Sequence, residues 1–166
     1  MAVFSVLGWS ALGRAADADG LRQRVDRRMA QVPSVSTDEL ARLMTSSKVL
    51  LLDVRTAEEF SLSHLPGAVR AETEASQRAA IESAAPDTVI VAYCAVGWRS
   101  GLAVEKLQPG SPRRLFNLRG SIFAWANEGR PLTDGAKAVQ VVHPFDRTWG
   151  QLLDKRFWPP DWRSED

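Results

Sequence analysis

Cysteine is nearly absent from this chain, because Cys94 is the only one in 166 residues. A single cysteine excludes an internal disulfide and any cysteine-rich zinc site. Histidine is also scarce, and His64 and His143 are too far apart in the sequence to give a metal-ligand spacing. We therefore expect neither a metal ion nor a cofactor. An oxidised or sulfur-loaded Cys94 would need an external thiol to discharge it, since no resolving cysteine is present.

The sequence also lacks a dominant charge and a long apolar run. Its net charge is +1, which gives no reason to expect a nucleic-acid partner. The uncharged stretch at residues 1–13 is shorter than the about 20 apolar residues that a membrane-spanning helix needs. Apolar residues make up 45% of the chain and charged residues 25%, which is typical of a globular protein. The length suits one domain with a substantial core.

The N-terminal segment has two interpretations. Residues 1–13 have the length of a signal-peptide core, and Ala16-Asp17-Ala18 has the pattern of a cleavage site, but no Lys or Arg precedes the apolar run. The apolar residues also fit one face of a helix that packs on the domain. Residues 20–31 then predict a basic amphipathic helix, which either packs on the domain or lies on an anionic membrane. We expect a cytoplasmic protein, with export or membrane association through residues 1–18 as the alternative.

The most informative stretch is residues 89–101, which surround the cysteine. Residues 89–93 are apolar and mostly β-branched, which predicts a buried strand. A loop of small residues with Gly97 follows, and apolar residues then recur at helical spacing. In such a strand–loop–helix, backbone N–H groups point into the loop and favour negative charge there. Cys94 should therefore have a lowered pKa and act as a nucleophile, with Arg99 as a fixed cation beside it.

A structural role for Cys94 is the alternative. A lone cysteine is more often a small buried hydrophobe than a catalyst. Cys94 follows the predicted strand instead of lying within it, and loop-like residues come next. Its position alone leaves both interpretations open, so the rest of the chain has to decide between them.

Further stretches share one family pattern with the cysteine loop. In chain order they are Leu51-Leu52-Asp53-Val54-Arg55 with Glu58-Glu59-Phe60, Ser63-His64-Leu65-Pro66-Gly67-Ala68, Cys94-Ala95-Val96-Gly97-Trp98-Arg99-Ser100 and Phe116-Asn117-Leu118-Arg119-Gly120-Ser121-Ile122-Phe123-Ala124-Trp125. Together they resemble the motifs of rhodanese-type sulfurtransferases over about residues 37–132. One such match would be weak evidence, whereas this many in the expected order identify the chain as a member of the family.

The resemblance implies an α/β fold, a three-layer α/β/α arrangement with a central, mostly parallel five-stranded sheet. Periodic and capped segments predict helices at 37–44, 56–60, 74–85, 100–107 and 121–127, and strands at 49–54, 89–93 and 114–118. We divide the chain into an N-terminal helical segment (1–36), a rhodanese-like domain (37–132) and a C-terminal extension (133–166). The extension holds too many aromatic residues to stay in water, so it should pack across the domain, where it would cover the site or recognise an acceptor protein.

The resemblance also implies sulfur transfer through a persulfide on Cys94. A small-molecule donor such as thiosulfate would load the cysteine, and a thiol, cyanide or an acceptor protein would remove the sulfur. Arg99 would bind the oxyanion of the donor. The active-site loop would comprise Ala95, Val96, Gly97, Trp98, Arg99 and Ser100. Ala95 and Val96 are small and apolar where many relatives carry a charged residue, which lowers the local positive potential.

Other polar residues near the predicted site have supporting roles in this interpretation. Asp53 and Arg55 lie at the end of a strand, where open α/β folds place their sites. They resemble family residues that brace the active-site region by hydrogen bonds and ion pairing. His64 could be mistaken for a general base, but the resemblance implies a structural position in the turn.

Two other functions stay open. Phosphatases and arsenate reductases of related fold use a longer Cys–Arg loop, whereas only Ala95, Val96, Gly97 and Trp98 separate Cys94 from Arg99 here. The shorter loop resembles the sulfurtransferase size. The second alternative is a binding module that keeps the fold without turnover, and the intact Cys94 and Arg99 argue against a simple loss of activity.

Overall fold

The computed structural model describes residues 7–163, with side chains from residue 17 onward. The helices are α1 (Leu7–Arg28), α2 (Thr37–Ser46), α3 (Ala57–Leu62), α4 (Glu74–Ser83), α5 (Trp98–Leu107), α6 (Ser121–Asn127) and α7 (Pro160–Arg163). The strands are β1 (Ser34–Val35), β2 (Val49–Asp53), β3 (Val69–Arg70), β4 (Val89–Tyr93), β5 (Leu115–Leu118), β6 (Leu132–Thr133) and β7 (Ala138–Val139). Three short 3₁₀ helices are η1 (Gln108–Gly110), η2 (Trp149–Leu152) and η3 (Lys155–Phe157).

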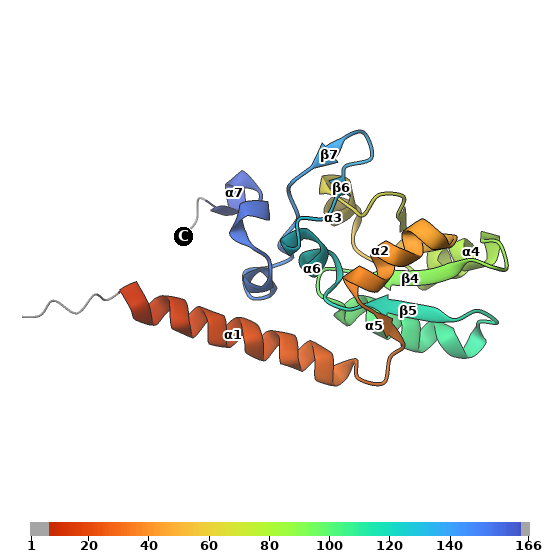
Figure 1. Cartoon of the computed structure of the whole chain (residues 1–166), viewed down its shortest axis with the longest axis horizontal. Helices are drawn as coiled ribbons and strands as arrows, with labels where there is room; N and C mark the ends of the chain where they lie inside the picture. Colours follow the sequence, from red (N-terminus) through yellow and green to blue (C-terminus); the bar gives the residue numbers. More distant parts are fainter. Residues whose placement is uncertain (1–6, 164–166) are drawn as a thin grey trace, which may run out of the picture.

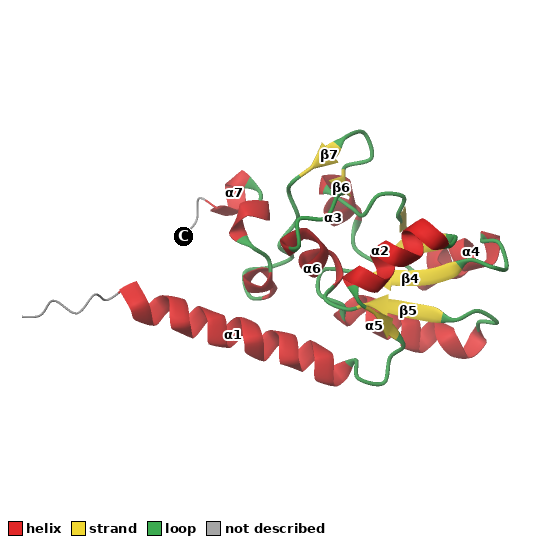
Figure 2. Cartoon of the chain, in the orientation of Figure 1, coloured by secondary structure: helices red, strands yellow, loops and turns green. Residues whose placement is uncertain are grey.

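The core is a five-stranded sheet in the order β1-β5-β4-β2-β3, and every neighbouring pair is parallel. The predicted α/β fold with a central parallel sheet is therefore confirmed. The two longest strands, β2 and β4, lie side by side in the middle, with Leu51 opposite Val91. Their apolar runs are explained by burial, since helices cover both faces of a parallel sheet. In Figure 2, α2 lies above β4 and β5 and α5 lies below them.

The starts of three helices follow from local sequence. Ser36, Thr56 and Thr73 each accept a hydrogen bond from the backbone N–H three residues later. The side chain at that later position reaches back to the backbone N–H of the capping residue in each case. These reciprocal capping boxes satisfy N–H groups that the first helical turn leaves free. Ser36 is thus the residue that caps α2.

Within the N-terminal segment, residues Leu7–Arg28 form one continuous helix, α1, whose C-terminal half packs on the domain, and Ser34–Val35 form strand β1 (Figure 1). Val25 and Met29, two members of the predicted apolar stripe, are buried. Arg28 donates paired hydrogen bonds of 2.7 and 2.8 Å to Glu105 of α5. The signal-peptide interpretation concerns residues 1–18, of which residues 1–6 lie outside the described residues. Between residues 7 and 163, no helix is both long enough and apolar enough to cross a membrane.

The C-terminal segment begins with the antiparallel hairpin of β6 and β7 and then runs back across the domain, beside α6 in Figure 1. Asn127, at the end of α6, holds it through its side chain, which donates to the Leu152 carbonyl (2.8 Å) and accepts from the Asp154 N–H (2.8 Å). Phe157 and Trp158 are buried. The segment is thus fixed to the domain by hydrogen bonds as well as by apolar packing.

Candidate active site

Cys94 lies directly after β4, where α6 determines the path of the chain. The Cys94 N–H donates to Ser121 Oγ at 3.1 Å. The carbonyls of Cys94 and Ala95 accept hydrogen bonds from the N–H groups of Ile122 (3.2 Å) and Phe123 (3.1 Å). The N-terminus of α6 therefore binds the carbonyl side of the loop. Since these carbonyls are held by α6, the opposite side of the loop can present N–H groups to the thiol.

The Cys94 thiol is buried, with 1% of the residue exposed, and the loop supplies it with hydrogen-bond donors. The Gly97 N–H donates to Sγ at 3.2 Å, and the Ser100 hydroxyl lies 3.5 Å from it. Burial raises the pKa of the Cys94 thiol, but the charge of Arg99 and the hydrogen bonds from Ser100 and Gly97 lower it by more. Its pKa therefore lies below the ordinary value, as a nucleophilic thiolate requires.

Asn117 of β5 holds the loop by hydrogen bonds to two of its residues. Its amide donates to the Gly97 carbonyl (3.0 Å) and its Oδ1 accepts from the Ser100 hydroxyl (2.7 Å). A serine hydroxyl has one proton, so Ser100 can donate either to Asn117 or to Cys94 Sγ. The contact with Asn117 is the shorter one, so the Ser100 hydroxyl donates mainly to Asn117. The charge of Arg99 and the backbone N–H groups of Ser100 and Gly97 still lower the pKa of the thiol. The sequence offered one signal for Asn117, a buried polar residue in an otherwise apolar strand.

Arg99 is paired with a glutamate that the sequence analysis did not select as a site residue. Its guanidinium donates to both carboxylate oxygens of Glu59, at 2.8 and 2.7 Å. The Glu59 side chain is 3% exposed, and Arg99 together with the Thr56 N–H lowers its pKa despite the opposing effect of burial. Glu59 is also the capping-box residue of α3. That local role was visible in the sequence, but its pairing with Arg99, forty positions away, was not.

The thiol lines a pocket of about 220 Å³. The lining residues are Cys94, Ala95, Val96, Trp98, Arg99, Phe145 and Trp149. Trp98 thus forms part of the pocket wall, and its ring lies 6.3 Å from that of Trp149. Phe145 covers the guanidinium of Arg99, with 4.7 Å between Cζ and the ring centroid. Phe145 and Trp149 come from the C-terminal segment, so residues far from the cysteine in sequence complete the pocket.

Asp53 and Arg55 form a buried ion pair beneath the site. Both side chains are fully buried, and Arg55 donates to the two carboxylate oxygens of Asp53 at 2.7 to 3.1 Å. Arg55 also donates to the Ser63 carbonyl at 2.6 Å. Asp53 lies opposite Tyr93, the residue before the cysteine, in the pairing of β2 with β4. The pair thus ties the turn at Ser63 to the end of the central strands.

His64 is held in the same turn. Its ring stacks on Phe60 at 3.9 Å, and its Nδ1 lies 2.9 Å from the Phe60 carbonyl oxygen. Its backbone pairs with Thr133. These contacts are structural and do not involve the thiol.

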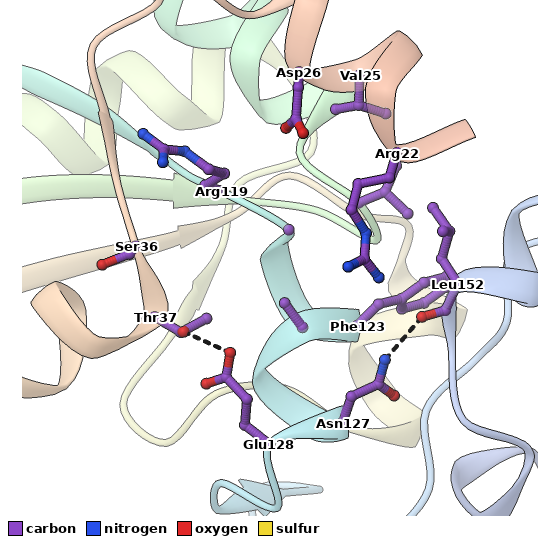
Figure 3. A pocket seen from close by; sticks show the side chains of 13 residues that line it. Arg22, Val25, Asp26, Ser36, Thr37, Arg119, Phe123, Asn127, Glu128 and Leu152 are labelled. Atoms are coloured by element: carbon purple, nitrogen blue, oxygen red, sulfur yellow. Dashed lines mark hydrogen bonds between the residues drawn. The ribbon is translucent and has the colours of Figure 1, made fainter. Parts of the chain in front are cut away.

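A larger cavity of about 440 Å³ lies between α1, the start of α2 and α6 (Figure 3). Arg22 of α1 reaches toward Phe123 of α6 across it. Val96 lines this cavity and the pocket at Cys94, so one residue of the loop separates the two spaces. Within residues 7–163, no group of three or more histidine, cysteine, aspartate or glutamate side chains is placed to hold a metal ion.

Replacement of Gly97 by alanine tests the loop geometry. Gly97 has φ +98°, and a Cβ there would lie 3.3 Å from the Leu118 carbonyl oxygen. We expect a loss of about 1–2 kcal/mol in the free energy of unfolding, the usual cost of a left-handed non-glycine residue. We also expect slower alkylation of Cys94 at pH 7, because the N–H contact with Sγ is displaced. Gly67→Ala is the matched control, since Gly67 has φ +78° and open space around its Cβ position.

Urea unfolding and the rate of alkylation by iodoacetamide measure the two effects separately. Gly67→Ala should lose similar stability without a change in the alkylation rate. An unchanged alkylation rate in Gly97→Ala would argue against a role of the Gly97 N–H in thiolate formation.

Known proteins are similar to this chain in sequence. A sequence model described as the rhodanese-like domain matches residues 36–128. A protein of Allochromatium vinosum named sulfurtransferase is 32% identical over 102 residues, which cover 61% of this chain and 94% of that protein. Residues 36–128 contain Cys94, Arg99, Glu59 and the Asp53–Arg55 pair.

Solved structures share the fold. A rhodanese-related protein from Thermoplasma volcanium superposes with a TM-score of 0.52 at 24% identity, over 61% of this chain and 97% of that one. A thiosulfate sulfurtransferase from Pseudomonas aeruginosa gives a TM-score of 0.59 at 22% identity, over 82% of this chain and 27% of that one. At these identities the structures establish the arrangement of helices and strands alone.

Proposed function

Because the chain belongs to the rhodanese-like domain family and is related to a sulfurtransferase, we propose that it transfers sulfane sulfur through a persulfide on Cys94. The observation that carries the proposal is the environment of the thiol. Cys94 Sγ accepts the Gly97 N–H, lies beside the Arg99 charge and has a lowered pKa in spite of complete burial. A buried structural cysteine would have a raised pKa and no reactivity.

In the first step the Cys94 thiolate attacks the outer sulfur of the donor. With thiosulfate, a bond forms between Sγ and the sulfane sulfur, the sulfur–sulfur bond of thiosulfate breaks, and sulfite leaves with the electron pair. The product is the Cys94 persulfide anion. The Gly97 N–H and the charge of Arg99 stabilise this anion as they stabilise the thiolate, which is the electrostatic contribution of the loop.

In the second step an acceptor thiolate attacks the outer sulfur of the persulfide. The bond between that sulfur and Sγ breaks, its electron pair returns to Cys94, and the acceptor leaves as a persulfide. This is a covalent two-step cycle. Asp53 and Arg55 take no part in this chemistry. They support the site because they fix the end of β4 that precedes Cys94.

Intact-protein mass spectrometry after brief incubation with thiosulfate tests the proposal. Wild type should gain one sulfur, about 32 Da, and lose it again on treatment with dithiothreitol or cyanide, as a covalent intermediate requires. Cys94→Ser should gain nothing under the same conditions.

Two negative results have different meanings. A wild-type protein that gains no mass from thiosulfate but whose thiol alkylates readily at neutral pH would call for another sulfur donor, with polysulfide as the next one to try. If the protein gains no mass and its thiol is also inert, the proposal of an enzyme would be contradicted. The alternative of a binding module with the same fold would then remain.

A further inference from the structure

We propose that the natural acceptor of this site is a small, uncharged thiol with an apolar body, selected by Phe145 and Trp149 of the C-terminal segment. The inference rests on the proposed sulfur transfer and concerns what enters the pocket above Cys94. Three properties of that pocket carry it, namely its walls, its charge and its access.

The walls of the pocket are apolar. Apart from Cys94 and Arg99, all of its lining residues are aliphatic or aromatic: Ala95, Val96, Trp98, Phe145 and Trp149. An acceptor with an apolar body would gain free energy from leaving water here. A charged or strongly polar body would find few hydrogen-bond partners among these side chains, and it would lose its hydration.

The one cation of the pocket is already neutralised. Both terminal nitrogens of Arg99 donate to Glu59 at 2.8 and 2.7 Å, and Phe145 lies over the guanidinium plane. An anionic acceptor would therefore have to compete with Glu59 for Arg99. Since Glu59 also accepts from the Thr56 N–H, the carboxylate is held in place from two sides. The pair contributes no net charge, which favours an uncharged occupant.

Access to the sulfur is narrow. Cys94 is 1% exposed, so a bulky acceptor does not reach Sγ itself. A persulfide places the reacting sulfur one bond, about 2 Å, beyond Sγ and into the pocket. A volume of about 220 Å³ suits a low-molecular-weight thiol. Glutathione is both larger and charged.

The two outer walls belong to a segment beyond the matched family region, which ends at residue 128. They are nevertheless firmly placed. The Trp149 N–H donates to the Asp146 carboxylate at 2.7 Å, and the Phe145 N–H donates to the His143 ring at 3.0 Å. The φ of Phe145 is +69°, a backbone angle that a bulky apolar residue adopts only when its surroundings impose it. The residue is 41% exposed. These walls thus lie outside the region that the family model matches.

The proposed step transfers one sulfur atom and no net electrons. The acceptor enters as a thiol and gives its proton to the outer sulfur of the Cys94 persulfide anion. The acceptor thiolate then forms a bond to that sulfur, and the bond from that sulfur to Sγ breaks. The electron pair stays on Sγ as the Cys94 thiolate, and the acceptor leaves as its persulfide with the proton.

The experiment measures single-turnover discharge of the persulfide by two thiols. Wild-type protein is loaded with inorganic polysulfide, desalted, and mixed with phenylmethanethiol or with the anion 2-mercaptoethanesulfonate. Each rate is divided by the rate of the same thiol with glutathione persulfide free in solution, which removes differences in intrinsic nucleophilicity. We expect a normalised preference for phenylmethanethiol of tenfold or more, roughly what hydrophobic pockets achieve between related substrates.

Three variants locate the origin of the preference. Phe145→Ser combined with Trp149→Ala should remove most of it. Glu59→Gln, which keeps a residue suited to the capping box, should speed the anionic thiol by about fivefold, since it frees Arg99 from a partly exposed ion pair. Phe116→Ala is the control, because this partly buried aromatic residue of β5 lies against Arg114 and does not line the pocket, and it should leave the preference intact.

Equal normalised rates for the two thiols in wild type would overturn the inference, and so would a preference that survives the Phe145→Ser, Trp149→Ala double change. Neither result would contradict the formation of the Cys94 persulfide. Failure of polysulfide to load wild type at Cys94 would instead overturn the proposed sulfur transfer, and the inference with it.

Discussion

Replacing Arg99 with glutamine is expected to slow persulfide formation at pH 7 on the order of hundredfold, comparable with the loss of one preorganised donor in an oxyanion site. Two effects act in the same direction. The cation that lowers the pKa of the buried thiol disappears, and the negative charge of Glu59 is no longer balanced by Arg99. Both raise the pKa of Cys94, so less thiolate is present at neutral pH.

The direction of the pH dependence follows from the same contacts. Cys94 has a lowered pKa in the folded protein, so its alkylation rate should rise with pH with a midpoint below that of an ordinary thiol, about 8.5. In Arg99→Gln the midpoint should move to higher pH. The rate of iodoacetamide labelling, measured from pH 5 to about pH 10, the ordinary range of thiol titration, gives the midpoint of each protein directly.

A double variant separates the two effects of Arg99→Gln. Combining it with Glu59→Gln removes the unbalanced negative charge as well, so the midpoint should fall back toward the wild-type value without reaching it. A midpoint in Arg99→Gln equal to that of wild type would show that the loop N–H groups alone set the pKa of the thiol.

The sheet and the cysteine loop could be predicted because their signals are local. The apolar runs of β2 and β4 are typical of strands buried on both faces, and both strands lie inside the sheet, flanked by neighbours on each side. Helix ends were less well predicted. Residues 20–31 were expected to form a helix, but α1 ends at Arg28, and the predicted helix at 74–85 ends at Ser83.

The partners of the loop could not be predicted, because they come from distant parts of the chain. Asn117 meets Gly97 through the pairing of β5 with β4, and Glu59 meets Arg99 where α3 approaches α5. No spacing in the sequence encodes either contact. Phe145 is the clearest case, since its position over Arg99 depends on how the whole C-terminal segment folds back.

The contacts of Arg99 in the structure change the role that we propose for it. The sequence led us to expect an arginine that binds the oxyanion of the donor. The structure places both of its terminal nitrogens on Glu59 and an aromatic ring over its face. We therefore propose that Arg99 mainly stabilises negative charge on Cys94, since each of the two groups shifts the pKa of the other.

Asp53→Asn is expected to destabilise the protein by about 3–5 kcal/mol, because it leaves the charge of Arg55 buried without its counterion. Both side chains are 0% exposed, and Asp53 is the carboxylate that accepts hydrogen bonds from the guanidinium, whereas Glu59 acts on it only through its charge. For a chain of this length such a loss lowers Tm by roughly 6–20 °C. Urea unfolding at pH 7 and calorimetry measure both quantities.

Two further proteins show whether burial is the cause. Asp87→Asn makes the same chemical change in the exposed Lys48–Asp87 pair, whose side chains are 67% and 65% exposed, and should not shift the urea midpoint measurably. Asp53→Leu combined with Arg55→Met removes both charges and should recover much of the lost stability, since apolar residues can replace a buried pair without a large cost. If the double variant were as unstable as Asp53→Asn, the hydrogen bond from Arg55 to the Ser63 carbonyl would be the main contribution, and the pair would act by fixing that turn rather than by balancing its own charges.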